Sequence, residues 1–293
     1  MILKDFEAYN PIVIFIYFAG VTVPAMLCQD PALLCISLGG ALALRLTIKG
    51  AGCIKSVVRL SALPLLLGLA NPLFNHNGAT VLFLINDTPI SLESALFGLT
   101  SGLMLMGILL WFASFSDIMT GDKLLYIFGA LSPKLALIFS MTLRYIPLYR
   151  RQSKKVRQSQ KALGLVKEEN PLDRLRAGLR IFSVMVTWAL ENGVITADSM
   201  SARGYGCGRR THFAIYRWRR EDFLLLAAAL LLSFTVAAGI AAGLLGWDYF
   251  PYISRPSGAL RFPILFCYTA LSLIPAALNI KEALLWKSLQ SKA

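Results

Sequence analysis

The chain has 293 residues, of which 56% are hydrophobic and 15% are charged, and its mean hydropathy is +0.62. So apolar a composition excludes a disordered chain. The charged fraction is also below the roughly 25% that is typical of soluble domains. The net charge of +13 would suit a nucleic-acid-binding protein, but such a protein would not be this apolar. The composition therefore predicts an integral membrane protein.

A membrane span needs about 20 mostly apolar residues. The chain contains six apolar runs near this length. The runs lie at 12–28, 32–44 (extendable to 48), 57–74, 92–115, 223–245 and 262–280. The residues before the first run lack a signal-peptide cleavage pattern, so we expect a retained helix there. In the fourth run, Gly98 and Gly102 suit close helix packing, within the chain or against another subunit.

Lysine and arginine mark the cytoplasmic side of a membrane protein. The 45–59 connection holds four of them and the C-terminal tail three, whereas the 29–31 and 75–91 connections hold none. Six spans with both termini in the cytoplasm satisfy this pattern. The 246–261 loop is the exception, because it would lie outside and yet carries two arginines, Arg255 and Arg261.

The stretch 116–222, between the fourth and fifth runs, is unusually long and basic. Within 143–220 there are 17 Lys+Arg and 5 Asp+Glu, a net charge of +12, so this segment holds nearly all of the +13. Residues 124–143 are apolar but interrupted, and a span there would carry the basic block outside. We expect instead a helix at the cytoplasmic face. The resulting division is 1–123, 124–222 and 223–293, with the middle segment cytoplasmic.

Two long helices are predicted in this insert. Four cations share one face of the first helix, which ends near residue 162: Arg150, Lys154, Arg157 and Lys161. The second helix covers 172–203, because its apolar residues recur every three or four positions. Pro171 suits its first turn, and Gly164 and Gly204 fit left-handed caps at the two helix ends.

The second helix ends on the tripeptide Ala202-Arg203-Gly204. Alanine permits close approach of a partner, and glycine ends the helix. Arg203 lies at the negative end of the helix dipole and can pair bidentately with a carboxylate beyond the helix. Two interpretations follow: an ordinary favourable cap, or a rigid plug for an acidic groove.

Three segments, in order along the chain, resemble the transmembrane (T) component of energy-coupling factor transporters, the EcfT/CbiQ family. Residues 201–206, Ser-Ala-Arg-Gly-Tyr-Gly, resemble the family's second signature. Residues 143–147, Leu-Arg-Tyr-Ile-Pro, followed by 160–164, Gln-Lys-Ala-Leu-Gly, resemble its first coupling helix. Residues 71–78, Asn-Pro-Leu-Phe-Asn-His-Asn-Gly, followed by Thr-Pro-Ile at 88–90, resemble its third-span and loop signature.

The resemblance implies a non-catalytic scaffold of an importer for vitamins, vitamin precursors or transition-metal ions, in a bacterial cell membrane. Two cytoplasmic ABC ATPases would bind the ends of two coupling helices, and a membrane S component would capture the substrate. The lipid bilayer is the other partner, and neither nucleic acid nor a cofactor is expected. The ATPase-coupling residues would be Arg157, Lys161, Ala162, Gly164, Ala202, Arg203 and Gly204.

One position departs from the family pattern. The first signature usually reads Ala-Arg-Gly, and Leu163 stands here in place of the arginine. The first docking site is therefore expected to depend more on packing, or on Lys161 and Arg157. The substrate cannot be derived from this chain, because the S component selects it.

The sequence leaves two other classes of function open. A polytopic enzyme acting on an anionic or lipid substrate would need a cluster of acids, bases or metal ligands, which 143–220 lacks. A stand-alone secondary transporter would need ionisable residues within its spans or an internal repeat. No phosphate-binding loop occurs, so ATP hydrolysis would fall to a partner. His76, a single histidine beside asparagines, is expected to order its loop instead of binding metal.

Overall fold

The computed structural model describes residues 6–75, 78–85, 88–164, 171–208, 216, 218–254, 258 and 260–290. The chain divides into two compact units, which we call the membrane unit (1–120 with 216–293) and the insert unit (121–215). The earlier division at 123 and 222 stays a prediction.

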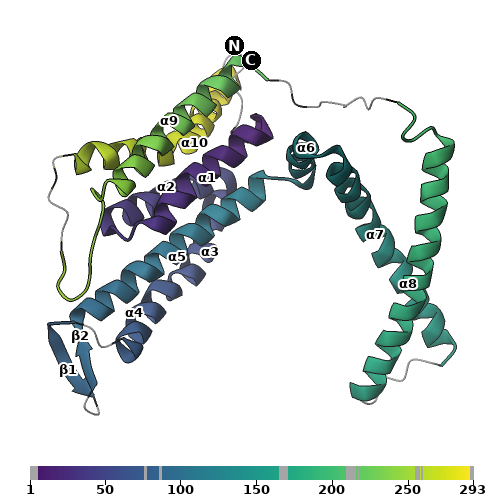
Figure 1. Cartoon of the computed structure of the whole chain (residues 1–293), viewed down its shortest axis with the longest axis horizontal. Coiled ribbons are helices and arrows are strands. Elements are labelled where there is room, and N and C mark those ends of the chain that lie inside the picture. Colours follow the sequence, from purple (N-terminus) through teal and green to yellow (C-terminus); the bar gives the residue numbers. More distant parts are fainter. Residues whose placement is uncertain are drawn as a thin grey trace. The chain divides into compact units, whose positions relative to one another are not determined.

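Within the described residues, the membrane unit is mainly helical and contains one short hairpin (Figure 1). Its elements are α1 (Pro11–Leu27), α2 (Pro31–Lys49), α3 (Cys53–Leu60), α4 (Ala62–Phe74), β1 (Val81–Ile85), β2 (Thr88–Ser91), α5 (Leu92–Ile118), α9 (Arg220–Ala241) and α10 (Arg261–Gln290). The insert unit contains α6 (Gly121–Leu131), α7 (Pro133–Ala162) and α8 (Pro171–Ala202).

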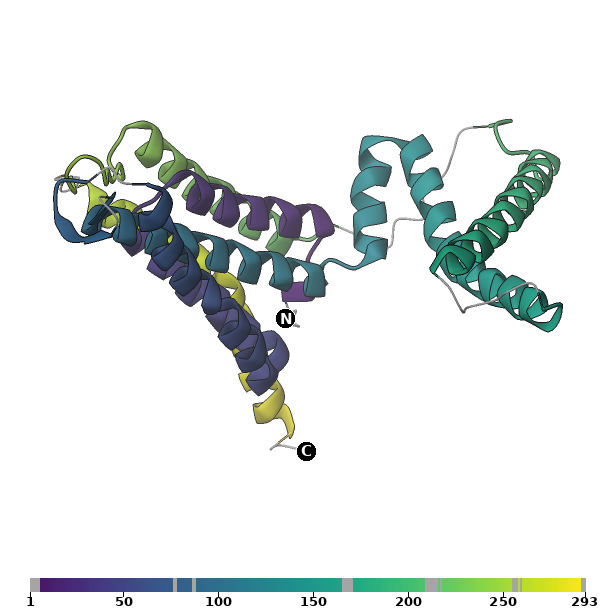
Figure 2. The ribbon, with the colours of Figure 1, turned by 90° about the horizontal axis from the view of Figure 1, so that it is seen from below.

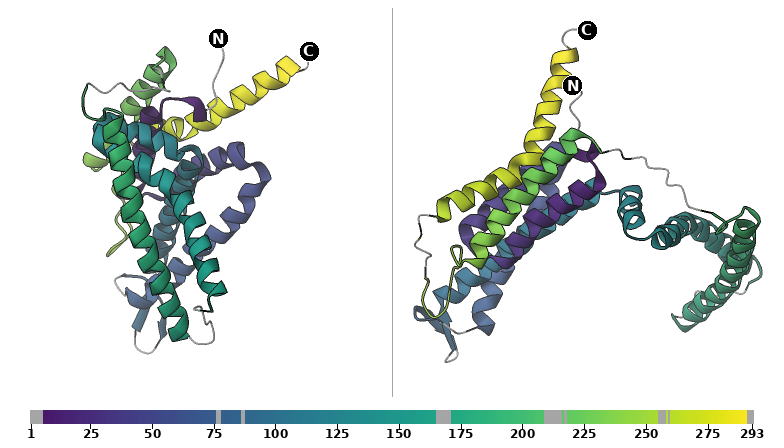
Figure 3. Two further views of the ribbon diagram at one scale, coloured as in Figure 1. Left: turned by 90° about the vertical axis from the view of Figure 1, so that its right-hand side faces the viewer. Right: turned by 45° about the horizontal axis from the view of Figure 1, so that its top comes forward.

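Five segments are long and apolar enough to cross a membrane, which confirms an all-α, multi-pass membrane protein. They are α2, α3 with α4, α5, α9 and α10. The first predicted span, α1, has 17 residues and is shorter than this group, so the total of six spans stays a prediction. Figure 3 shows the C-terminal part of α10 projecting beyond the other helices of the membrane unit, and Pro275 lies within this helix.

The first two helices begin with the same local device. Asn10 and Asp30 each precede a proline, and their side chains accept hydrogen bonds of 3.0 Å from the amides of Ile12 and Ala32. Proline suits the first helical position because the amide it lacks would be unpaired there. Such caps define where α1 and α2 start.

Glycines allow α4 and α5 to pack closely. A side-chain carbon built on Gly98 would lie 2.3 Å from the carbonyl oxygen of Leu67, and one on Gly102 would lie 2.4 Å from Cα of Pro64. Both distances are far below van der Waals contact, so only glycine fits without a shift of the backbone. The predicted packing role of Gly98 and Gly102 is confirmed, and their neighbour is α4 of the same chain.

A β-hairpin lies in the 75–91 connection, where the sequence predicted only a loop. Strand β1 pairs antiparallel with β2, and α5 follows directly. Glu93, in the first turn of α5, is 3% exposed and accepts hydrogen bonds from the backbone amide (3.1 Å) and the hydroxyl of Thr80. The positive end of the helix dipole also stabilises a carboxylate in this first turn. Glu93 therefore connects the hairpin to the helix that follows it.

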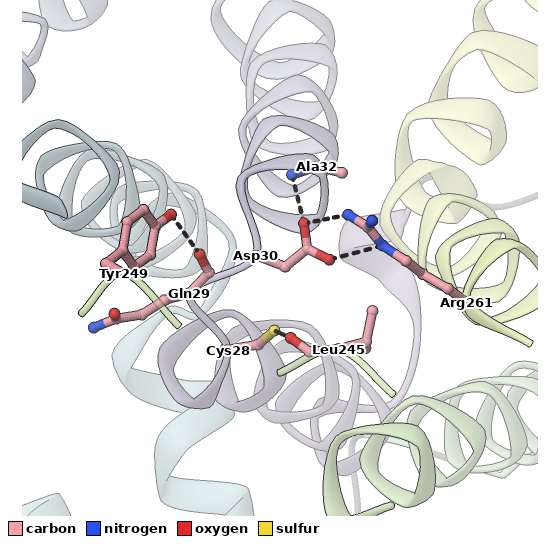
Figure 4. A network of polar contacts seen from close by, with 7 residues as sticks. All are labelled: Cys28, Gln29, Asp30, Ala32, Leu245, Tyr249 and Arg261. Carbon is pink, nitrogen blue, oxygen red and sulfur yellow. Dashed lines mark hydrogen bonds and ion pairs between the residues drawn. The ribbon is translucent and has the colours of Figure 1, made fainter. Parts of the chain in front are cut away.

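A buried polar network joins the α1–α2 connection to the residues between α9 and α10 (Figure 4). Arg261 donates to both carboxylate oxygens of Asp30, at 3.1 and 2.8 Å, and its guanidinium carbon lies 5.4 Å from the ring centroid of Trp247. The hydroxyl of Tyr249 donates to the carbonyl of Gln29 (3.1 Å). Asp30 thus neutralises Arg261, an arginine that the charge pattern did not accommodate. Arg255 lies outside the described residues.

Within the insert unit the helix is interrupted at Ser132, whereas the sequence predicted one helix at the cytoplasmic face over 124–143 and a separate one ending near residue 162. Ser132 has an extended backbone (φ −153°, ψ 118°), and α7 starts at Pro133. The helical conformation is unfavourable for a residue that precedes proline, which explains the break. The predicted start of α8 at Pro171 is confirmed.

Candidate functional site

Helices α7 and α8 cross in the insert unit (Figures 1 and 3). At the crossing, the hydroxyls of Tyr145 and Thr196 lie 2.7 Å apart, and the rings of Tyr149 and Trp188 meet edge to face at 5.4 Å. Tyr149 also stacks on Tyr145 (5.6 Å, 15°). Since later residues of α7 meet earlier residues of α8, the two helices run in opposite directions.

This antiparallel crossing separates the two predicted docking ends. At a rise of 1.5 Å per residue, the end of α7 at residue 163 lies about 27 Å beyond Tyr145. The end of α8 at Arg203 lies about 10 Å beyond Thr196, in the opposite sense along the pair. The two ends therefore form separate surfaces, and the structure does not bring the predicted site residues into one cluster.

The end of α8 has a complete two-bond C-cap. Gly204 adopts φ +76°, its amide donates to the carbonyl of Ser201 (3.0 Å), and the amide of Tyr205 donates to the carbonyl of Met200 (3.0 Å). These are the two hydrogen bonds of the Schellman motif, and a left-handed residue at this position favours glycine. The predicted cap is confirmed.

Arg203 occupies the cap residue itself. Its amide donates to the carbonyls of Ser199 and Met200, at 3.2 Å each, so its backbone is held in place. The residues Ala202, Arg203 and Gly204 are all exposed. The backbone of Arg203 is thus anchored at the helix end, while its exposed guanidinium can pair with a carboxylate beyond the helix.

The end of α7 repeats the first part of this geometry. Gly164 has φ +69°, and its amide donates to the carbonyl of Lys161 (3.1 Å). Leu163, at the position of Arg203, is 72% exposed. Arg157, Lys161 and Ala162 are exposed too. This end therefore offers an apolar tip with cations on the turns before it.

An apolar stripe runs along α8, as the sequence periodicity predicted. Its residues are 40–68% exposed although they are large and aliphatic or aromatic: Leu175, Leu179, Phe182, Val186 and Leu190. Exposed apolar surface of this extent is of the kind that contacts lipid or another protein. Polar residues also lie in the second half of α8. Asn192 donates to the carbonyl of Trp188 (2.9 Å), while Glu191 and Asp198 are exposed.

Sequence reasoning missed the contacts that set the crossing and the polar network of the membrane unit. Tyr145 belongs to the segment that resembles the first coupling helix, but no sequence pattern identified Thr196 as its partner. His76 lies outside the described residues. Among the residues that are described, no group of three or more His, Cys, Asp or Glu side chains is placed to hold a metal ion.

Comparison with known proteins gives a consistent family name. The EcfT protein of Listeria innocua, an energy-coupling factor transporter transmembrane protein, is 34% identical over 102 residues, which are 34% of this chain and 38% of that protein. EcfT 1 of Listeria monocytogenes is 31% identical over 101 residues (34% and 38%), and EcfT of Exiguobacterium sibiricum is 31% identical over 107 (34% and 41%).

These relatives confirm the resemblance to EcfT. The chain spans about two fifths of the length of the curated relatives it matches. No family model matches it. These relatives share the name of an energy-coupling factor transporter transmembrane protein, which agrees with the membrane-spanning helices of this chain.

Proposed function

We propose that this chain is the T component of an energy-coupling factor importer. In this role it transmits the movements of two cytoplasmic ATPases to a membrane S component. The observation that carries the proposal is the end of α8, where a fully formed C-cap holds the exposed Arg203 at a fixed position. The similarity to EcfT supports the same assignment.

The two helix ends would bind two ATPases in different ways. Arg203 would insert its guanidinium into an acidic groove, since bidentate pairing with a carboxylate combines charge with a fixed orientation. Leu163 would instead fill an apolar hollow, while Lys161 and Arg157 pair with acids at its rim. The distance between the ends supports two separate partners.

The S component would contact the exposed apolar stripe of α8. Burying such residues against another membrane protein gains about 25 cal/mol per Å² of apolar area. Because the same helix carries Arg203 at its end, a movement imposed on Arg203 would reach the stripe through a rigid rod. The cargo would be a vitamin, a vitamin precursor or a metal ion, and both termini would face the cytoplasm.

The test is co-purification of the full chain with its two ATPases from membranes. Arg203→Glu places a carboxylate where the groove is acidic, so we expect one ATPase to be lost and uptake to fail. Arg180→Glu is the matched control, because Arg180 is exposed on the same helix and its replacement changes the charge equally. If Arg203→Glu retains both ATPases and normal uptake, the proposal is wrong.

A further inference from the structure

The segment formed by α3 and α4 lies at the edge of the membrane unit (Figures 2 and 3). It is the most exposed of the five spanning segments. In its most apolar stretch 11% of the residues are buried, whereas 44% are buried in α5. The close glycine contacts with α5 occupy one side of α4, so its other side is open.

An apolar stripe follows the open side of this segment from end to end. Ile54, Val58, Leu65 and Leu69 recur at steps of four, seven and four residues and are 58–75% exposed. The regular spacing places them on one face of a helix. Ser61, between α3 and α4, retains helical backbone angles, so the stripe continues from one helix to the other.

Two cations adjoin the stripe at its α3 end. Lys55 and Arg59 are one turn apart, and both are exposed. Across the described part of the chain, no ion pair involves either residue. The cations of the preceding helix differ, because Lys49 and Arg45 lie 2.8 and 3.7 Å from Asp117. The 45–61 stretch itself contains no acidic residue.

We propose that α3 and α4 form a binding site for an anionic phospholipid of the cytoplasmic leaflet. The phosphate would lie on Lys55 and Arg59, and an acyl chain would lie along Ile54, Val58, Leu65 and Leu69. The basic residues of the 45–59 connection place this end of the segment at the cytoplasmic leaflet, whose lipids are negatively charged. The stripe lies within the candidate spanning segment Cys53–Phe74, and Leu65 and Leu69 lie farther along it from the two cations, toward acyl-chain depth.

The charge favours a lipid over a partner helix at this site. A helix from another membrane protein would cover the stripe but would need acidic residues at the membrane surface to neutralise both cations. An anionic headgroup and its acyl chain supply the negative charge and the apolar surface in one molecule, in the spatial order that the site presents. This inference does not depend on the role of Arg203.

The test is native mass spectrometry of the purified full chain, titrated with palmitoyl-oleoyl phosphatidylglycerol or with the zwitterionic phosphatidylcholine. At about 1 kcal/mol per cation, Lys55→Gln with Arg59→Gln should weaken phosphatidylglycerol binding roughly 30-fold. Phosphatidylcholine binding should weaken much less, because the choline ammonium offsets the charge of its phosphate. The matched control is Arg174→Gln with Arg180→Gln, two exposed cations of α8, which should have less than a threefold effect.

Two further measurements separate the alternatives. Val58→Ser with Leu69→Ser should weaken the binding of both lipids, because these side chains contact the acyl chain. A photo-reactive residue at position 58 should cross-link to lipid in native membranes. Equal losses in the α3 pair and the α8 control, or a cross-link to a membrane protein, would overturn the proposal. If the double variant is unstable, Arg59→Gln alone should give a loss of roughly fivefold.

Discussion

Removing Arg261 should destabilise the membrane unit strongly. The Asp30 carboxylate is fully buried and accepts three hydrogen bonds, two from Arg261 and one from the amide of Ala32. Arg261→Met removes both charge-assisted bonds and leaves a buried, unpaired carboxylate. Breaking one side of a buried pair costs about 3–5 kcal/mol. The free energy of unfolding, measured in detergent by circular dichroism during denaturant titration, should fall by that amount.

A double-mutant cycle separates the ion pair from the loss of packing. Asparagine at position 30 retains a capping oxygen for α2, so Asp30→Asn with Arg261→Met should cost only about 1–2 kcal/mol. Lys49→Met is the control, since Lys49 forms an exposed ion pair with Asp117 at 2.8 Å and should contribute less than about 1 kcal/mol. If Arg261→Met costs no more than Lys49→Met, the argument that burial makes the Asp30 pair important is refuted.

Four further predictions follow from individual residues. Gly98→Ala and Gly102→Ala should each lower the free energy of unfolding by about 1–3 kcal/mol. Gly107→Ala is the control and should not lower it, because a side-chain carbon there would lie 3.9 Å from the nearest atom, Oγ of Ser37. Gly204→Ala should lower the free energy of unfolding by about 1–2 kcal/mol, because Gly204 has φ +76°, and it should speed hydrogen exchange at the Tyr205 amide. Gly193→Ala, in open space within α8, should leave that exchange unchanged. Glu93→Ala should cost about 1–3 kcal/mol because it leaves the Thr80 amide unpaired, and unaltered thermal unfolding would contradict this. Burial raises the pKa of the Tyr249 hydroxyl above 10.0. The neutral hydroxyl therefore stabilises the fold below pH 10, and this contribution is lost as the pH rises further. Tyr249→Phe should reduce the loss of stability at alkaline pH.

The class of the protein was readable from sequence because it depends on local patterns. Apolar length predicts the spanning helices, and the spacing of Lys154 and Arg157 predicts an exposed face of α7. The cap at Gly204 follows from the chemistry of one residue type in one place. Each of these signals lies within a few turns of helix, so neighbouring residues are sufficient to define it.

The interactions that the sequence did not reveal join residues far apart in the chain. Asp30 and Arg261 are separated by 231 positions, and nothing near either residue identifies the other. The pairing of Tyr145 with Thr196 is of the same kind. The hairpin at 81–91 was missed for another reason, because its strands are only five and four residues long.

The long-range bonds also explain how the chain carries so large an insert. The amide of Phe6 donates to Asn279 (3.0 Å), and the hydroxyl of Tyr17 donates to the carbonyl of Leu271 (2.7 Å). These bonds join the first and last parts of the sequence directly, and residues 1–120 and 216–293 form one compact unit. The membrane unit is thus linked across its two sequence ranges by buried contacts, whereas α8 of the insert unit leaves its apolar stripe exposed. That division would suit the proposed coupling role, because the membrane unit keeps its own contacts while the exposed stripe of α8 stays available to a partner.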